Sequence, residues 1–193
     1  SPNFLQEIDR YAQAGHRAIQ GYLDIKNPGD NWISLSYAIG YWYTNRFLDL
    51  ARSNMGLAAM LGGTGSCMAM SLVDEIGWNP HSITEDLEFT IQCILRGVHP
   101  VWAWDARVYD EKPTDMKVSW YQRMRWMRGH FSLMFQYSGA LWKRLFRHFD
   151  MASFDMLVYL GQPIWMVFSY LLTFVYLGIQ VGNITTLPRW ASA

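Results

Sequence analysis

The sequence predicts an α/β domain that is followed by an amphipathic segment and by a helix long enough to cross a membrane. Within residues 1–138, apolar residues recur at helical spacing in some stretches and alternate with polar residues in others, as in the helices and strands of one domain. Residues 139–152 combine basic and aromatic side chains, which is typical of a helix at a membrane interface. Residues 156–181 carry no charged side chain, and this run exceeds the ~20 apolar residues that a bilayer requires.

The amino-acid composition indicates which kinds of binding partner the protein has. The 193 residues have a formal net charge of zero, so we expect no nucleic-acid partner. The ten Trp residues favour membrane interfaces or carbohydrate contacts. The two cysteines, Cys67 and Cys93, match neither a disulfide framework nor a zinc site, and reduced thiols fit the cytoplasmic side. Basic residues before the apolar run also predict that the segment preceding it is cytoplasmic.

Residues 1–53 predict two helices with one strand between them. The first helix ends at Gly15, a strand follows over 17–26, and a turn at 27–31 leads into a long helix from residue 32 to about residue 53. One side of this long helix is apolar and rich in aromatic residues: Trp32, Leu35, Ile39, Trp42, Tyr43, Phe47 and Leu50. That side fits a domain core and a membrane surface equally, and both interpretations stay open.

A glycine-rich turn, Gly62-Gly63-Thr64-Gly65, leads into a short strand that contains Cys67. It is neither a P-loop, since no Gly-Lys-Ser/Thr follows, nor a dinucleotide fingerprint, since the third glycine is missing. A backbone without side chains would let a ligand approach closely, whereas a plain tight turn would need the same residues. A short helix is expected next, over residues 71–76.

The motif Thr84-Glu85-Asp86 begins the next predicted helix, which Gly97 ends. Thr84 is expected to cap the helix. Acidic residues in a first turn commonly complement the helix dipole, and on that ground alone the structural interpretation is favoured. The functional alternative is that Asp86 acts as a general base.

A strand over 101–108 and a loop at 111–114 lead into a basic segment. No Asp or Glu occurs from residue 117 to residue 147, although seven basic residues lie there: Lys117, Arg123, Arg125, Arg128, Lys143, Arg144 and Arg147. If the segment is helical, Gln122, Arg125 and Trp126 share one face, which offers an amide, a guanidinium and an indole. These groups suit a diphosphate and a sugar ring. A basic helix lying on an anionic membrane is the alternative.

The chain resembles the C-terminal half of the catalytic domain of membrane-embedded family 2 glycosyltransferases, the processive β-glycan synthases. These enzymes make cellulose, chitin, hyaluronan and poly-N-acetylglucosamine. The motifs that carry the resemblance are Thr84-Glu85-Asp86 and Gln122-Arg123-Met124-Arg125-Trp126, which fits the family's Gln-x-x-Arg-Trp. Gly63-Thr64-Gly65 and Glu111-Lys112-Pro113 lie where the family has similar short signatures. One departure is Ile76-Gly77-Trp78, where many members have Gly-Gly-Trp.

The resemblance implies a GT-A fold, a mixed sheet with helices on both faces, and inverting transfer from a nucleotide-activated sugar, usually a UDP-sugar. Asp86 would be the base, with Glu85 beside it in the catalytic motif. Further residues would bind the diphosphate and the acceptor: Gln122, Arg123, Arg125, Trp126, Thr84, Gly63, Thr64, Gly65 and Cys67. The family's Mg²⁺ or Mn²⁺ is held mainly by an upstream Asp-x-Asp that these residues lack, so we expect the fragment alone to be inactive.

The expected domain organisation follows from the same resemblance and from the apolar run. The C-terminal part of the GT-A domain is expected at 1–138, an interfacial segment at 139–152, a transmembrane helix at 153–182 and a tail at 183–193. The full-length protein is expected in the cell membrane, with several spans and a cytoplasmic catalytic part. Its expected partners are a nucleotide sugar, a glycan acceptor and the lipid membrane.

Two alternatives stay open. One is a non-processive membrane glycosyltransferase that acts on a lipid or protein acceptor. The other is a non-catalytic, membrane-anchored module that binds a glycan or a nucleotide.

Overall fold

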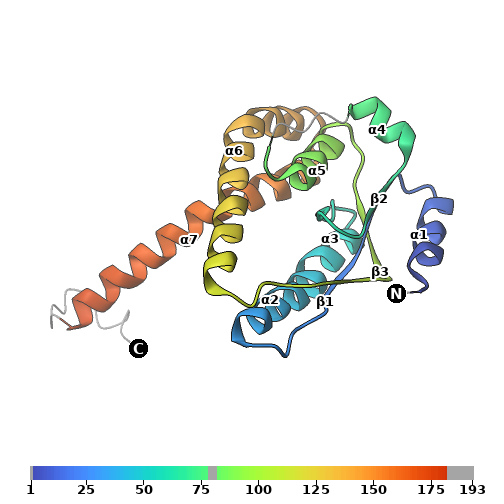
Figure 1. Ribbon diagram of the computed structural model, residues 1–193. Helices are drawn as coiled ribbons and strands as arrows, with labels where there is room; N and C mark the ends of the chain where they lie inside the picture. The colour runs from blue at the N-terminus through green and yellow to red at the C-terminus, as the bar shows by residue number, and fades with distance from the viewer. Residues whose placement is uncertain (1, 78–81, 182–193) are drawn as a thin grey trace.

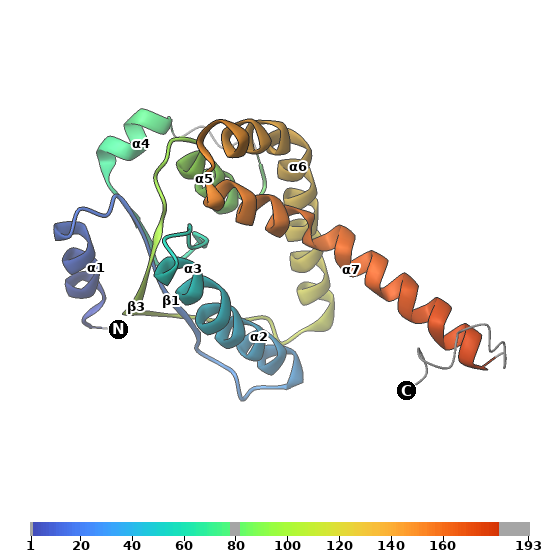
Figure 2. The ribbon, with the colours of Figure 1, turned by 180° about the vertical axis from the view of Figure 1, so that it is seen from behind.

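A computed structural model of the chain describes residues 2–77 and 82–181, and shows a small sheet between helices, with two long helices on one side (Figures 1 and 2). The elements in chain order are α1 (Phe4–Gln13), β1 (Ala18–Ile25), α2 (Trp32–Tyr43), the π-helix η1 (Thr44–Asp49), α3 (Leu50–Asn54), β2 (Ser66–Met68), α4 (Met70–Ile76), α5 (Glu85–Leu95), β3 (Val101–Asp110), α6 (Met116–His148) and α7 (Met151–Val181). Trp78 and the predicted tail lie outside the described residues.

The sheet has the order β2-β1-β3, with β1 antiparallel to β2 and parallel to β3. The register of β1 and β3 shifts between Gly21 and Tyr22. Gly21 is required there, because an added β-carbon would lie 2.9 Å from the Phe4 ring of α1 and would also press on the carbonyl of Ala106. One antiparallel and one parallel pairing confirm the mixed sheet that the family resemblance implied.

Helices cover both faces of the sheet. On one face, Ile19 and Ala103 pack against Ile8 of α1. On the other face, Ala18 packs with residues of α4 and α5, including Leu72 and Phe89. This division follows the alternation of side chains along a strand, which sends neighbouring residues to opposite faces.

The long helix expected from residue 32 is continuous through α2, η1 and α3. Asn31 begins it with a capping box: its side chain accepts from the amides of Ile33 and Ser34, and the Ser34 side chain accepts from the Asn31 amide. Most of the aromatic side left open by the sequence faces solvent: Trp32, Leu35, Ile39, Trp42, Tyr43 and Phe47 are exposed, and only Leu50 is partly buried. The interpretation as a domain core is therefore wrong for this side.

A second core joins α5, α6 and the start of α7. Its buried members are Ala58, Leu87, Ile91, Ile94, Leu133, Met134, Leu141, Ala152, Met156 and Leu160. The first ten residues of α7 thus belong to the folded domain, whereas the rest of the helix projects away from it (Figures 1 and 2).

One helix, Met151–Gln180, is long and apolar enough to cross a membrane, which weakly indicates membrane association. The expected limits at residues 139 and 153 fall inside α6 and α7 rather than at breaks between helices. These domain limits therefore stay predictions.

Met156 tests the division of α7 into a packed part and a projecting part. Met156→Ala should lower the free energy of unfolding by about 2–5 kcal/mol, because it opens a cavity among fully buried neighbours. Met166→Ala is the matched control, since the Met166 side chain is 42% exposed on the same helix. Thermal unfolding in detergent measures both, and equal losses would contradict the division.

Candidate active site

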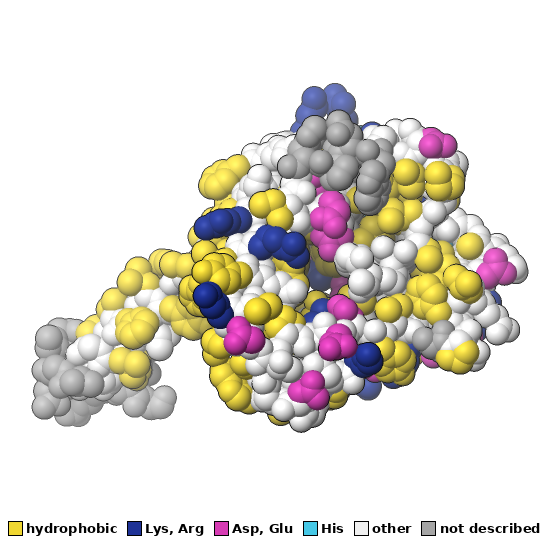
Figure 3. Space-filling model, viewed as in Figure 1, with side chains coloured by type: hydrophobic (Ala, Val, Ile, Leu, Met, Phe, Trp, Pro, Cys, Tyr) yellow, Lys and Arg dark blue, Asp and Glu magenta, His cyan; other side chains and the backbone are white. Residues whose placement is uncertain are grey.

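A cavity of about 410 Å³ lies between α2 and η1 on one side and the start of α5 and the first half of α6 on the other. The glycine-rich turn, β1, β3 and Tyr159 of α7 also contribute to its wall. The space-filling view shows a hollow in the middle of this face with acidic side chains at its edge (Figure 3). Of the predicted site residues, Gly63, Thr64, Thr84, Glu85, Asp86, Gln122, Arg125 and Trp126 line the cavity.

Asp86 lies in the first turn of α5 with its carboxylate at the cavity wall. One carboxylate oxygen, Oδ1, accepts from the Leu87 amide at 2.7 Å. Burial raises the pKa of Asp86 above its usual value, and the Glu85 charge raises it further, while the hydrogen bonds from backbone amides act in the opposite direction. Glu85 itself is exposed at the rim. Asp86 is therefore a partly buried carboxylate of the cavity wall, and its role as the general base stays a prediction.

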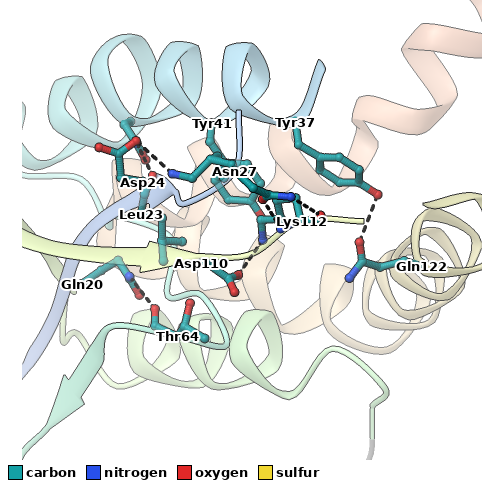
Figure 4. Close-up of polar contacts among 12 residues, drawn as sticks. Gln20, Leu23, Asp24, Asn27, Tyr37, Tyr41, Thr64, Asp110, Lys112 and Gln122 are labelled. Carbon is teal, nitrogen blue, oxygen red and sulfur yellow. Dashed lines mark hydrogen bonds and ion pairs between the residues drawn. The ribbon is translucent and has the colours of Figure 1, made fainter. Parts of the chain in front are cut away.

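The glycine-rich turn passes directly beside this carboxylate. A β-carbon added at Gly63 would lie 3.7 Å from Asp86 Oδ2. The fully buried Gln20 of β1 holds the turn at two points. Its Nε2 donates to the Thr64 carbonyl at 3.0 Å (Figure 4), and its Oε1 accepts from the Gly62 amide at 2.7 Å. This turn lines the cavity, and its contact with a ligand stays a prediction.

Two further side chains fix the residues before the turn. The Met60 amide donates to Asp49 Oδ1 at 3.1 Å, and the Leu61 amide donates to Thr90 Oγ1 at 3.1 Å. Asp49 lies at the end of the π-helix, a type of segment that is frequent at functional sites. Burial raises the pKa of Asp49 to about 6, although Met60 and the nearby Arg52 act in the opposite direction.

The three residues expected on one face of α6 do share it. Gln122, Arg125 and Trp126 all line the cavity, opposite the glycine-rich turn. Tyr37 of α2 supports two of them: its hydroxyl donates to Gln122 Oε1 at 3.0 Å, and its ring meets the Trp126 ring edge-on, with centroids 6.2 Å apart. An amide, a guanidinium and an indole therefore converge on the space beside Asp86.

Lys112 adds a second cationic side chain to the wall. Its Nζ lies 2.6 Å from Asp110 Oδ2 and 3.3 Å from the Tyr41 hydroxyl (Figure 4). Burial alone would lower the pKa of Lys112, but the hydrogen bonds and charges of Asp110 and Tyr41 outweigh it, so the pKa is raised. Lys112 is thus a charged group held in place at neutral pH.

Known proteins share the sequence of this chain to different extents. Residues 1–187 match the family described as Glycosyl transferase family group 2. The chain belongs to this family. It is also 29% identical, over 86 residues, to the Bacillus subtilis (strain 168) protein named "Probable glycosyltransferase YdaM". That match covers 44% of this chain and 20% of the relative, so the chain spans about a fifth of that protein.

Three predicted site residues of this family member lie outside the cavity. Gly65 packs against Val108, so closely that a β-carbon would lie 2.7 Å from the Val108 side chain. Cys67 pairs with Ile19 in the sheet and packs in the cluster on the α1 face, away from the cavity. Arg123 lies one step round α6, with its guanidinium 4.3 Å from the centre of the Tyr37 ring. The structure does not place these three side chains at the cavity, and their contact with substrate stays a prediction.

Thr84 occupies the N-cap position of α5, as predicted, but its side chain makes no capping hydrogen bond. Its hydroxyl instead lies 3.0 Å from the Ser82 hydroxyl. Gly129 of α6 packs against it, because a β-carbon at Gly129 would lie 2.6 Å from Thr84 Cγ2 and closer still to the hydroxyl. This contact brings the two sequence motifs to the same cavity.

The sequence interpretation missed the inner side of α2 and η1. Tyr41, Asn45 and Asp49 line the cavity from there, and Tyr37 lies one turn earlier. The Asn45 side chain donates to the Leu23 carbonyl at 2.8 Å. These four residues follow one another at a spacing of four, which places them on one side of a helix. This spacing could have predicted a polar side, but the aromatic residues of the opposite side drew attention away from it.

A divalent metal is general in the family, and the resemblance implied Mg²⁺ or Mn²⁺. Within residues 2–77 and 82–181, no group of three or more His, Cys, Asp or Glu side chains could hold a metal ion. The residues described here do not by themselves fit a metal site.

Gly129 tests the contact between α6 and α5. Gly129→Ala should cost about 1–3 kcal/mol of stability and also lower transferase activity, because the methyl group displaces Thr84 and the neighbouring Asp86. Gly139→Ala is the control on the same helix: no atom lies within 4 Å of its added β-carbon, so stability should rise by about 1 kcal/mol. Stability is measured by thermal unfolding and activity by the rate of sugar transfer, for both variants. Unchanged activity in a folded Gly129→Ala protein would argue against this role.

Proposed function

We propose that this glycosyltransferase transfers a sugar, with inversion, from a nucleotide sugar to a growing polysaccharide at the membrane. The observation that carries the proposal is the Asp86 carboxylate in a cavity that also presents Arg125, Gln122 and Trp126. The proposed donor is a UDP-sugar, and the proposed fold is of the GT-A type, in keeping with the mixed sheet covered on both faces.

In the proposed reaction, an acceptor hydroxyl oxygen attacks the anomeric carbon while Asp86 takes the hydroxyl proton. The bond from the anomeric carbon to the phosphate oxygen breaks, and its electron pair leaves with the nucleoside diphosphate. In this proposal Arg125 stabilises the charge that develops there and Trp126 contacts a sugar face, and the position of both at the cavity wall supports these roles. The low accessibility of Asp86 favours this role, because its raised pKa makes the carboxylate a stronger base.

The proposed setting is the cell membrane, with several spans in the full-length protein and the catalytic part on the cytoplasmic side. One long apolar helix that leaves the domain supports membrane association. A lipid acceptor with a single transfer is the second candidate. It is favoured by a groove of about 430 Å³ between η1 and α7, because Tyr159 lines both this groove and the cavity.

Asp86→Asn tests the proposed base. The complete polypeptide in membranes is supplied with a panel of UDP-sugars, and UDP release is measured. Release should fall by ~10²–10⁴-fold, while donor binding is retained because the amide keeps the shape of the carboxylate. Asp74→Asn, on the exposed surface of α4, makes the same chemical change away from the cavity and should leave release unchanged. Transfer retained in Asp86→Asn would overturn the proposal, and product length then separates a polymer from a single addition.

The pH dependence of kcat/KM gives an independent check. Asp86 must be ionised to accept a proton, and its pKa is raised, so activity should be lost on acidification at a pH above the ordinary value of 3.8 for an aspartate. The acidic limb of the pH profile should therefore lie higher than for an exposed carboxylate. An acidic limb at or below that value would show that Asp86 is not the group that titrates.

A further inference from the structure

We propose that Tyr37 is a positioning residue: its hydroxyl fixes the Gln122 amide so that the Gln122 NH₂ group donates to a substrate oxygen. This inference rests on the proposed function and adds to it a residue of α2 that contacts the substrate only through Gln122. It also gives Arg123 a role outside the cavity.

The first step is the burial of the Tyr37 hydroxyl. Tyr37 is 3% exposed, and a buried hydroxyl is costly unless it is hydrogen-bonded. Here the hydroxyl has two partners. One is Gln122 Oε1 at 3.0 Å (Figure 4), and the other is Ser119 Oγ at 3.0 Å. Packing alone would be satisfied by a phenylalanine, so the hydroxyl is explained by these two contacts.

The second step is the direction of the hydrogen bonds. Arg123 can only donate, and its Nε donates to Ser119 Oγ at 3.4 Å. The Tyr37 hydroxyl has one proton, which goes to Gln122 Oε1, so Ser119 must donate to the Tyr37 oxygen. The bonds therefore run one way, from Arg123 through Ser119 and Tyr37 to Gln122, and each polarises the next.

The third step is the orientation of Gln122. Because its carbonyl oxygen accepts from Tyr37, its NH₂ group is the part that stays available, and Gln122 lines the cavity. No hydrogen bond to Gln122 Nε2 is present within the part of the chain that the structure describes. Two N–H groups directed at the cavity fit an oxygen acceptor, such as a phosphate or a sugar hydroxyl oxygen of the bound substrate.

The Tyr37 ring supports the same side of α6. Trp126 meets it edge-on, and the Arg123 guanidinium lies over its face at 4.3 Å. Tyr37→Phe keeps the ring and both contacts and removes only the hydroxyl. It therefore separates the hydrogen bond from the packing.

The experiment is a double-mutant cycle of Tyr37→Phe and Gln122→Ala in the complete polypeptide, with kcat/KM for sugar transfer as the readout. Tyr37→Phe alone should lower kcat/KM by about 3- to 10-fold, the effect of one lost neutral hydrogen bond. In the Gln122→Ala background it should have no further effect, because Tyr37 acts through Gln122. Additive losses would overturn the inference. Tyr109→Phe, on an exposed tyrosine of β3, is the matched control.

Gln122→Glu gives a second test that does not depend on the fold tolerating a change at Tyr37. The glutamate keeps an oxygen that accepts from Tyr37 but lacks the NH₂ donors, so kcat/KM should fall at least as far as in Gln122→Ala. Wild-type kcat/KM in Gln122→Glu would show that Gln122 only accepts from Tyr37, and would overturn the inference. Asp86→Asn is measured in the same assay. If Asp86→Asn is inactive while Gln122→Glu is fully active, the proposed function is supported and only the role of Tyr37 and Gln122 is overturned.

Discussion

The arrangement of the cavity depends on the close approach of α6 to the first turn of α5. Gly129 permits it, because the Thr84 side chain occupies the space that a β-carbon would need. Apolar contacts among α5, α6 and the start of α7 hold the crossing, and Tyr137 of α6 adds a hydrogen bond of 2.8 Å to the buried Glu88 of α5. Two motifs that are far apart in the sequence therefore face each other.

The opposite wall reverses the usual amphipathic pattern. In α2 and η1 the side that faces the cavity carries Tyr41, Asn45 and Asp49, whereas the outer side is apolar and exposed. Buried polar groups are tolerated when each has a partner. Asn45 bonds to a strand carbonyl and Asp49 to the Met60 amide, so the same residues that line the cavity also hold the backbone around it.

The helix α7 has two environments along one continuous length. Its first turns are packed: Ala152, Met156 and Leu160 are buried with α5 and α6. Arg52 of α3 adds an ion pair with Asp155, at 2.7 Å between Nε and Oδ2. The second half leaves the domain with its apolar side chains exposed (Figures 1 and 2). Pro163 lies inside the helix, just after the last packed residue, Leu160.

The sequence by itself determined the order and type of most elements, because hydrophobic period, turn residues and caps are local properties. It also determined that Gln122, Arg125 and Trp126 share one face, since helical spacing fixes that relation. Only the tertiary structure decided which neighbouring residues are outside the cavity: Arg123 is adjacent in sequence yet turned to Tyr37, and Cys67 faces the α1 side because of its strand register. Packing likewise decided that α2 lines the cavity. The sequence pattern of a helix distinguishes its two sides, but it does not indicate which side faces a cavity.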